Sequence, residues 1–182
     1  AVATLSKLPG SNDAINANAI REGLRSVSWP GRLEVLARGP WLVVDSAHNG
    51  DSATRLMAAL RAHFSFHHLT VVVGASADHV TPEMMGAVLG AADCAIATQS
   101  RHPRAAGPEW LRLRAEAMGF RMEVCATVPD ALDLALDGAA KDDLICFAGS
   151  VFVAAEARAT WFERQGIAIP PSDHTESPVV IS

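Results

Sequence analysis

An acid, a hydroxyl, an imidazole and an amide follow one apolar run in the segment VVDSAHNGDSA, residues 43–53. Asp45 can accept hydrogen bonds from a sugar hydroxyl, and the imidazole of His48 can bind a carboxylate or a phosphate. The alternative is a capped turn, in which Asn49 or Asp51 satisfies the first N–H groups of a helix. We favour the capping role for Asp51. For His48, the local sequence leaves both roles open.

Arginines and a helix start supply further candidate contacts for an anion. Arg32 follows a Pro-Gly turn; its guanidinium either holds phosphate oxygens in a bidentate contact or is a solvated surface group. Gly149 and Ser150 precede an apolar helix, whose first N–H groups suit an anion, and Ser150 is also an ordinary N-cap residue. Arg101 and Arg104 make the loop RHPR basic.

Alternating helix and strand patterns must position these side chains. Apolar residues at helical spacing predict helices, and short apolar runs predict buried strands. Ser11, Asn12 and Asp13 are the candidate caps of the first helix. The predicted helices are 11–27, 51–63, 82–90, 108–118, 129–136 and 151–165, and the predicted strands are a hairpin within 32–45 followed by 69–76, 94–100, 120–127 and 144–150.

This order of elements predicts an α/β fold with a mostly parallel sheet of about six strands. Helices cover both faces of the sheet, and the hairpin adds one antiparallel edge strand. Ligands of open parallel sheets bind beyond the carboxyl ends of the strands. We therefore expect Asp45, His48, Arg104 and Ser150 to gather at one rim.

The composition excludes several classes of function. The chain has 182 residues, 49% of them hydrophobic, and a formal net charge of −5, which argues against a general nucleic-acid partner. No apolar run reaches the roughly 18 residues of a membrane span, so we expect no membrane partner. The sequence contains neither GxGxxG nor GxxxxGK[ST]. His63, His67 and His68 lack a matched acid or cysteine, and no metal site is expected there.

The three cysteines are interpreted as small buried hydrophobes in a reducing cytosol, because Cys94, Cys125 and Cys146 each stand in an apolar run without CxxC spacing. This interpretation predicts a cytoplasmic protein. The first residue is Ala, and we expect the chain to be part of a longer protein.

Three segments together resemble a known family. They are IREGLRSVSWPGRLEVL at 20–36, VVDSAHNGDSA at 43–53 and ICFAGSVFVAAEAR at 145–158. In order and spacing they are similar to the C-terminal domain of folylpolyglutamate synthase/dihydrofolate synthase, the folate branch of the Mur ligase superfamily. The resemblance covers about residues 12–165 and implies a Rossmann-like domain.

The resemblance also implies an activity. Enzymes of this family use ATP to phosphorylate a carboxylate of folate or pteroate, and the amino group of L-glutamate then attacks the acyl phosphate. By this likeness Arg32 and Asp45 bind ATP, His48 and Ser150 bind glutamate, and the loop that contains Asn49 supports them, as does the loop of Arg104. ATP and Mg²⁺ are bound mainly by an N-terminal Mur-type ATPase domain, so no metal ligand is expected in the present domain.

The implied organisation has three parts. Residues 1–28 are the end of the preceding ATPase domain and a linker, residues 29–166 are the C-terminal domain, and residues 167–182 are a Pro-rich tail. The ATPase domain is then the main partner, and the isolated chain is expected to be inactive. Two alternatives stay open: a stand-alone Rossmann-like module that binds a nucleotide or an amino acid without catalysis, and a domain of a different Mur-type amide ligase.

The chain departs from the family pattern at three places. Ser46 stands where the family usually has Gly, and Gly50 stands where it usually has Pro. The loop SADHV at 76–80 also lacks the lysine that the family often carries after the second parallel strand. A divergent substrate preference is one interpretation of these differences.

Overall fold

A six-stranded sheet forms the centre of the fold in the computed structural model, which describes residues 16–27 and 29–168. The strand order is β1-β2-β6-β3-β4-β5. β1 pairs with β2 in antiparallel fashion, and the other neighbouring strands pair in parallel. The predicted α/β class and the antiparallel edge strand are therefore confirmed. The strands are β1 (Glu34–Ala37), β2 (Trp41–Val44), β3 (Leu69–Val73), β4 (Cys94–Ala97), β5 (Glu123–Val124) and β6 (Leu144–Ala148).

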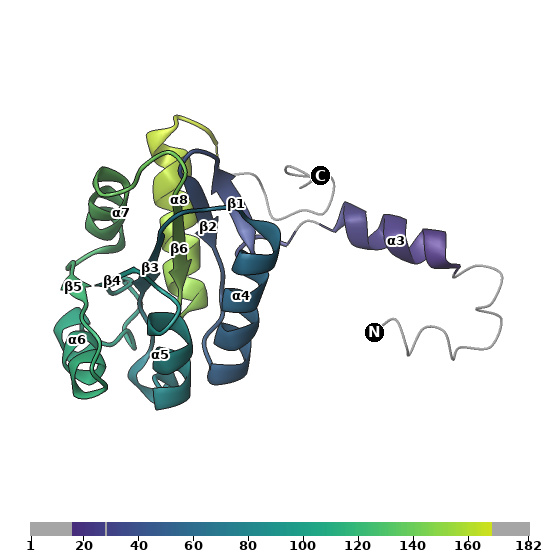
Figure 1. The fold of residues 1–182 in the computed structure, drawn as a ribbon. Coiled ribbons are helices and arrows are strands. Elements are labelled where there is room, and N and C mark those ends of the chain that lie inside the picture. The colour runs from purple at the N-terminus through teal and green to yellow at the C-terminus, as the bar shows by residue number, and fades with distance from the viewer. Residues whose placement is uncertain (1–15, 28, 169–182) are drawn as a thin grey trace. The chain divides into compact units, whose positions relative to one another are not determined.

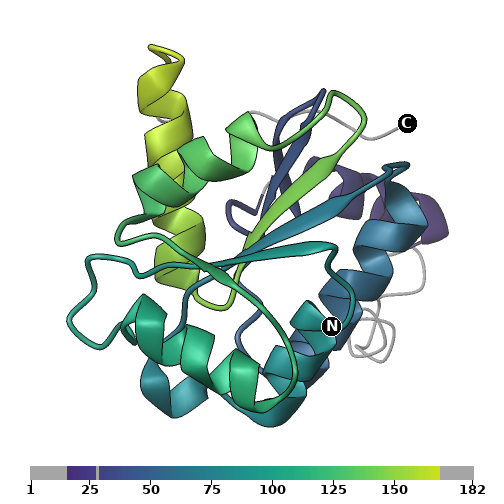
Figure 2. The same cartoon turned by 60° about the vertical axis from the view of Figure 1, so that its left-hand side comes forward.

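Helices cover both faces of this sheet, as the sequence predicts (Figures 1 and 2). Apolar residues of α4, α5 and α6 join one buried cluster, and those of α7 and α8 join the other. The strands supply both clusters in alternation, since successive side chains of a strand point to opposite faces: Val43 belongs to the first cluster, and Leu42 and Val44 belong to the second. The helices of this unit are α4 (Gly50–His63), η1 (Ala77–His79), α5 (Pro82–Leu89), α6 (Pro108–Ala117), α7 (Val128–Asp137) and α8 (Val151–Arg164).

Side chains just before the helices fix where the helices begin. The side chain of Asn49 accepts the backbone N–H of Ser52 and starts α4 with a capping box. Ser150 starts α8 in a similar way, by accepting the N–H of Phe152. Asp51 was favoured as a cap, and this expectation was wrong. It lies in the first turn and pairs with Arg55 at 2.9 Å.

The predicted strands extend past the observed ends, most of all at 120–127, where β5 contains only Glu123–Val124. The reason is tertiary. After β3 the chain leaves the sheet, and Ser76 forms an isolated bridge with Ala105 instead of continuing the strand. The local pattern cannot distinguish an apolar residue of a strand from one in the buried loop that follows it.

Two aspartates hold the amino end of the sheet. Asp143 accepts the N–H groups of Ala140 and His68, at 2.8 and 3.1 Å. These hydrogen bonds favour the carboxylate form and lower the pKa of Asp143 from its ordinary value of 3.8. Asp93 accepts the N–H of Leu69 at 2.8 Å. The starts of β3, β4 and β6 are therefore fixed relative to one another by carboxylates.

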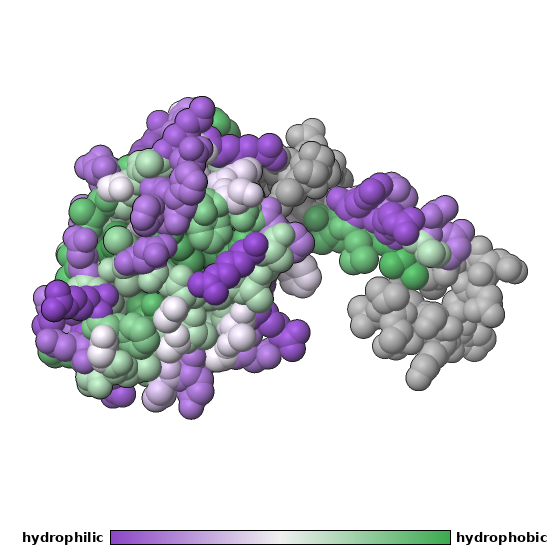
Figure 3. All heavy atoms as spheres, in the orientation of Figure 1, coloured by the Kyte–Doolittle hydropathy of each residue, from purple (hydrophilic) through white to green (hydrophobic). Residues whose placement is uncertain are grey.

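The helix α3 (Ala17–Ser26) belongs to a separate unit of the chain, whereas the whole sheet lies in the unit Pro30–Pro170. Asn16 caps it by accepting the N–H of Ala19. Ser11, Asn12 and Asp13, the predicted caps, lie outside the described residues. Figure 3 shows apolar residues along one side of α3, and Leu24 is 65% exposed. Among the described residues, no helix combines the length and the apolar character that a membrane crossing requires.

Candidate functional site

The direction of the chain changes at the carboxyl rim on either side of β6. The chain passes from β6 to α8 on one face of the sheet, whereas β2 and β3 lead to α4 and α5 on the other face. Ligands of open α/β sheets bind at the carboxyl rim where neighbouring strands lead to opposite faces of the sheet. The loops after β2 and β6 contain His48 and Ser150, so these two candidates lie at this rim. β1 runs opposite to β2 and pairs Glu34 with Val44, which brings the preceding Arg32 to the same rim.

The turn that carries Arg32 has an unusual backbone held by named contacts. Gly31 has φ +71° and Leu33 has φ +45°, a region that a residue with a side chain rarely adopts. The carbonyl of Gly31 accepts the N–H of Ser46 at 2.9 Å. The Arg32 side chain is exposed and makes no ion pair or hydrogen bond with any of the described residues. Its guanidinium is free to bind an anion.

Asp45 lies against this turn and uses both carboxylate oxygens. Oδ2 accepts the N–H of Leu33 and Oδ1 accepts the N–H of Ala47, both at 2.7 Å. Only 9% of Asp45 is exposed. Asp45 therefore ties the start of β1 to the end of β2. Because each carboxylate oxygen has more than one lone pair, the side chain can also accept a hydrogen bond from a ligand.

The imidazole of His48 is half-buried and has a defined proton position. Nδ1 lies 2.9 Å from the carbonyl oxygen of Ser46. Since a carbonyl only accepts hydrogen bonds, Nδ1 carries the proton. Nε2 has no hydrogen-bond partner in the described part of the chain and is available to a ligand. The ring of His79, from η1, packs edge-on against that of His48 with centroids 5.6 Å apart.

The turn into α8 brings backbone groups and a hydroxyl to the carboxyl rim. Gly149 has φ +99°, and a Cβ there would meet the carbonyl oxygen of Gly74 at 2.7 Å, so only glycine fits. The N–H of Gly149 donates to the carbonyl of Ala47 at 2.8 Å, which joins the loops after β2 and β6. Ser150 follows as the N-cap of α8. The start of a helix of this length carries partial positive charge that suits an anion.

The basic loop after β4 is anchored to α8. The N–H of Arg101 donates to Oε2 of Glu156 at 3.0 Å, and its Nε lies 3.1 Å from Oε1. The ring of His102 stacks on Phe152, with centroids 3.8 Å apart. Arg104 is exposed, and its backbone N–H donates to Nδ1 of His102. The loop is thus held beside the first turn of α8.

Residues 31–151 match the family model of the Mur ligase, glutamate ligase domain. The chain belongs to the Mur ligase family. The matched residues run from the turn of Arg32 to the first residue of α8, and thus include the carboxyl rim described above.

Several relatives in this family have folate-related names, and their chains are longer than this one. A probable bifunctional folylpolyglutamate synthase/dihydropteroate synthase of Haloferax volcanii is 37% identical over 88% of this chain, which spans 18% of that protein. A dihydrofolate synthase/folylpolyglutamate synthase of Mycobacterium tuberculosis is 31% identical over 82% of this chain, which spans 34% of that protein. The crystal structure of a bifunctional folylpolyglutamate synthase/dihydrofolate synthase from Yersinia pestis, complexed with AMPPNP and a Mn ion, matches with a TM-score of 0.72 and 26% identity over 85% of this chain and 35% of that one.

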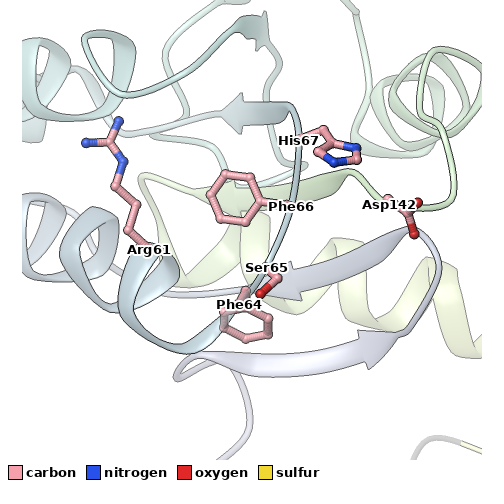
Figure 4. Close-up of a pocket in the computed structure, with 6 residues that line it drawn as sticks. All are labelled: Arg61, Phe64, Ser65, Phe66, His67 and Asp142. Atoms are coloured by element: carbon pink, nitrogen blue, oxygen red, sulfur yellow. The ribbon is translucent and has the colours of Figure 1, made fainter.

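A hollow of about 580 Å³ lies away from the carboxyl rim of this Mur ligase domain. Its lining comes from the segment before β3 and from Asp142, just before β6, so it lies at the amino end of the sheet. Figure 4 shows Phe66 in its middle, with Arg61 on one side and His67 and Asp142 on the other. The guanidinium of Arg61 contacts the carbonyl of Ala91. These polar groups do not converge on one point, and we assign no ligand to the hollow.

The cysteines of the domain differ in exposure. Cys146 is buried in β6, and burial raises the pKa of its thiol, with the nearby charge of Asp45 adding to the effect. Cys94 is exposed and Cys125 is half-buried, so the prediction that all three are buried was wrong. The reason is the shortness of β5, which pairs with Ile96 and Ala97 and leaves Cys94 without a strand neighbour on that side.

Sequence reasoning missed two charged residues that support the site. Glu34 in β1 and Arg158 in α8 form an ion pair whose side chains are 9% and 12% exposed. An available signal was Arg158 itself, a charged residue among the small apolar residues of the helix AAEARAT. Its partner could not be identified, since it lies 124 positions away.

Proposed function

We propose that this chain is the C-terminal domain of an ATP-dependent ligase that joins L-glutamate to a folate or dihydropteroate substrate. The observation that carries the proposal is the rim beside β6, where an arginine, an imidazole and a helix start come from three separate loops, and the guanidinium and Nε2 have no partner among the described residues. Membership of the Mur ligase family and relatives with folate-related names support it.

The reaction under this proposal has two steps. A carboxylate oxygen of the folate substrate attacks the γ-phosphorus of ATP, and ADP leaves. The amino group of glutamate then attacks the acyl carbon, the bond to the phosphate oxygen breaks, and an amide and inorganic phosphate are formed. The attacking amine loses a proton during the second step. Both transition states concentrate negative charge on phosphate oxygens, and cationic groups stabilise that charge.

The residues of this chain have separate tasks in the proposal. Arg32 binds phosphate oxygens of ATP, and Asp45 holds the turn that carries Arg32 and accepts a hydrogen bond from the nucleotide. His48 and Ser150 bind glutamate. Asn49 shapes the loop of His48, and Arg104 belongs to the supporting loop beside α8.

Magnesium is assigned to another part of the enzyme. In the segments 16–27 and 29–168, no three His, Cys, Asp or Glu side chains come together as a metal site. The Asp45 oxygens are already hydrogen-bonded to backbone N–H groups. We therefore assign Mg²⁺ and most contacts to ATP to a partner ATPase domain of the same protein, whose bound metal would neutralise phosphate charge.

The test is an assay of ADP release by the full-length protein. We expect release that depends on glutamate and on either dihydropteroate or tetrahydrofolate. Release with a peptidoglycan precursor and another amino acid, but with neither folate compound, would assign the domain to a different Mur-type ligase. No release with any of them, together with an open reading frame that contains no ATPase domain, would support a stand-alone binding module.

A further inference from the structure

The ion pair between Glu34 and Arg158 connects α8 to the edge strand β1. Nε of Arg158 lies 2.8 and 3.1 Å from the two carboxylate oxygens of Glu34. The guanidinium also lies over the ring of Phe162, 4.8 Å from its centroid. Withdrawing two charges from water costs about as much as their attraction returns, so a buried pair is weak evidence for stability. The contacts of its carboxylate suggest a different role.

Glu34 also contacts the turn of Arg32. Its Oε2 accepts the N–H of Gly31 at 2.8 Å. Arg32 thus lies between Gly31, which is held by Glu34, and Leu33, which is held by Asp45. A positive φ at a residue such as Leu33 costs on the order of 1 kcal/mol and persists only where the surroundings enforce it.

We propose that Glu34 and Arg158 are positioning residues for Arg32. Arg158 fixes the carboxylate of Glu34, the carboxylate fixes Gly31, and the backbone of Arg32 is thereby held at the carboxyl rim before the nucleotide binds. This inference rests on the proposed function, in which Arg32 contacts ATP. Ser150 is the N-cap of α8, so under the proposed function one helix supports both the phosphate side and the glutamate side of the site.

The expected consequence of losing this support is a selective fall in kcat/KM for ATP. A turn that must be ordered during binding loses part of the contact energy of its arginine to that ordering, whereas a turn already fixed in the free protein does not. Replacement of Arg158 by Met keeps the bulk of the helix surface and removes the charge. In the full-length enzyme we expect kcat/KM for ATP to fall roughly tenfold, with KM for glutamate changed by less than about twofold.

A double-mutant cycle separates positioning from ordinary structural support. If Arg158 acts through Arg32, the change Arg158→Met has no further effect on kcat/KM for ATP in an Arg32→Ala background. An effect that adds in full to that of Arg32→Ala overturns the inference. Arg164→Met is the matched control, because Arg164 lies on the same helix and pairs with Asp133 away from the turn; it should leave kcat/KM for ATP unchanged.

A second variant keeps the test decisive if Arg158→Met folds poorly. Glu34→Gln retains an oxygen that accepts the N–H of Gly31 and should lower kcat/KM for ATP less than Glu34→Ala does. Equal loss in both variants, with thermal unfolding unchanged, contradicts the inference. If Arg32→Ala by itself leaves ATP kinetics unchanged, the proposed role of Arg32 fails. If Arg32→Ala lowers kcat/KM for ATP and Arg158→Met does not, only the positioning inference fails.

Discussion

At the scale of single residues, some side chains at the carboxyl rim are already hydrogen-bonded within the chain, and others have no such partner among the described residues. Asp45, Asn49 and Ser150 all accept backbone N–H groups within the chain. The Arg32 guanidinium and Nε2 of His48 make no such contact within the described residues. The free groups are therefore the ones whose removal should affect ligands more than folding.

Arg32 is predicted to act on ATP rather than on stability. In the full-length enzyme, Arg32→Ala should lower turnover by a factor of ten or more, since a charge-assisted hydrogen bond contributes roughly 1.5–3 kcal/mol. Steady-state kinetics with varied ATP measure the effect. Arg38→Ala is the matched control, because Arg38 is exposed near the far end of β1 and lies over the ring of Trp41. Unchanged kinetics for Arg32→Ala would show that Arg32 is a solvated surface residue without a role in ATP binding.

His48 is predicted to contact glutamate through Nε2. His48→Asn retains a donor near the position of Nδ1, which contacts Ser46, whereas His48→Gln places its amide near the position of Nε2. We expect the Gln variant to keep a lower KM for glutamate than the Asn variant, by about tenfold, the scale of one hydrogen bond to a charged group. Measuring KM for glutamate of both variants at saturating ATP tests this prediction. The opposite order would show that His48 matters through its contact with Ser46.

At the scale of elements, carboxylates join chain segments at both rims of the sheet. At the carboxyl rim Asp45 acts together with backbone contacts such as the one from Gly149 to Ala47. At the amino rim Asp143 bridges Ala140 and His68. The pKa of Asp143 is lowered in the folded chain, so this residue carries a prediction about pH.

Asp143 is predicted to stabilise the fold above the acid range. Its pKa is lower in the folded chain than its ordinary value of 3.8, so the stability it contributes is complete above about pH 4 and disappears as the pH falls through the lower folded value. Asp143→Asn keeps one accepting oxygen and presents an amide to the other N–H. We expect a loss of about 1 kcal/mol at pH 7, the scale of one lost hydrogen bond from a part-buried donor, and a smaller loss at pH 3.

Urea unfolding of both proteins at pH 7 and pH 3 measures the difference for Asp143. Asp137→Asn is the matched control. Asp137 is the last residue of α7, is exposed, and has no hydrogen-bond partner among the described residues. Its substitution should change stability by less than about 0.5 kcal/mol at either pH. An equal loss for Asp143→Asn at both pH values would contradict the assignment.

At the scale of the whole molecule, this domain presents its candidate groups on an open rim. The hollow described above lies at the opposite end of the sheet. A rim whose candidate ligand contacts are arginines and an imidazole needs other groups to bind ATP and metal. Under the proposed function these groups come from an ATPase domain, and the closing of one domain on the other assembles the complete site and excludes water.

The predicted domain boundaries lead to a test on this scale. We propose that residues 29–166 fold independently, since the entire sheet and both buried clusters lie within them. A protein of these residues should unfold in one cooperative transition and release no ADP with glutamate and dihydropteroate, whereas the full-length enzyme should release it. Circular dichroism and the same ADP assay measure the two properties. Turnover by residues 29–166 alone would refute the need for a second domain.

The sequence by itself determined the order and type of the elements and the rim to which the candidates after parallel strands belong, whereas Arg32 was placed at that rim only by the pairing of β1 with β2. These properties depend on local patterns: apolar runs such as LTVVV, caps such as Asn49, and the rule that parallel strands end at one rim. The family resemblance was also readable from three short segments, and the family match confirmed it.

Only the tertiary structure decided how the side chains at the rim are used. The carboxylate of Asp45 holds Leu33, twelve positions away, and Arg158 holds Glu34 across 124 positions. The exposure of Cys94 depends on where β5 begins. Contacts of this kind depend on which distant segments pack together, and no local spacing in the sequence encodes that choice. The physical reason is that a carboxylate or a guanidinium satisfies the same hydrogen-bonding needs with many partners, and packing selects one of them.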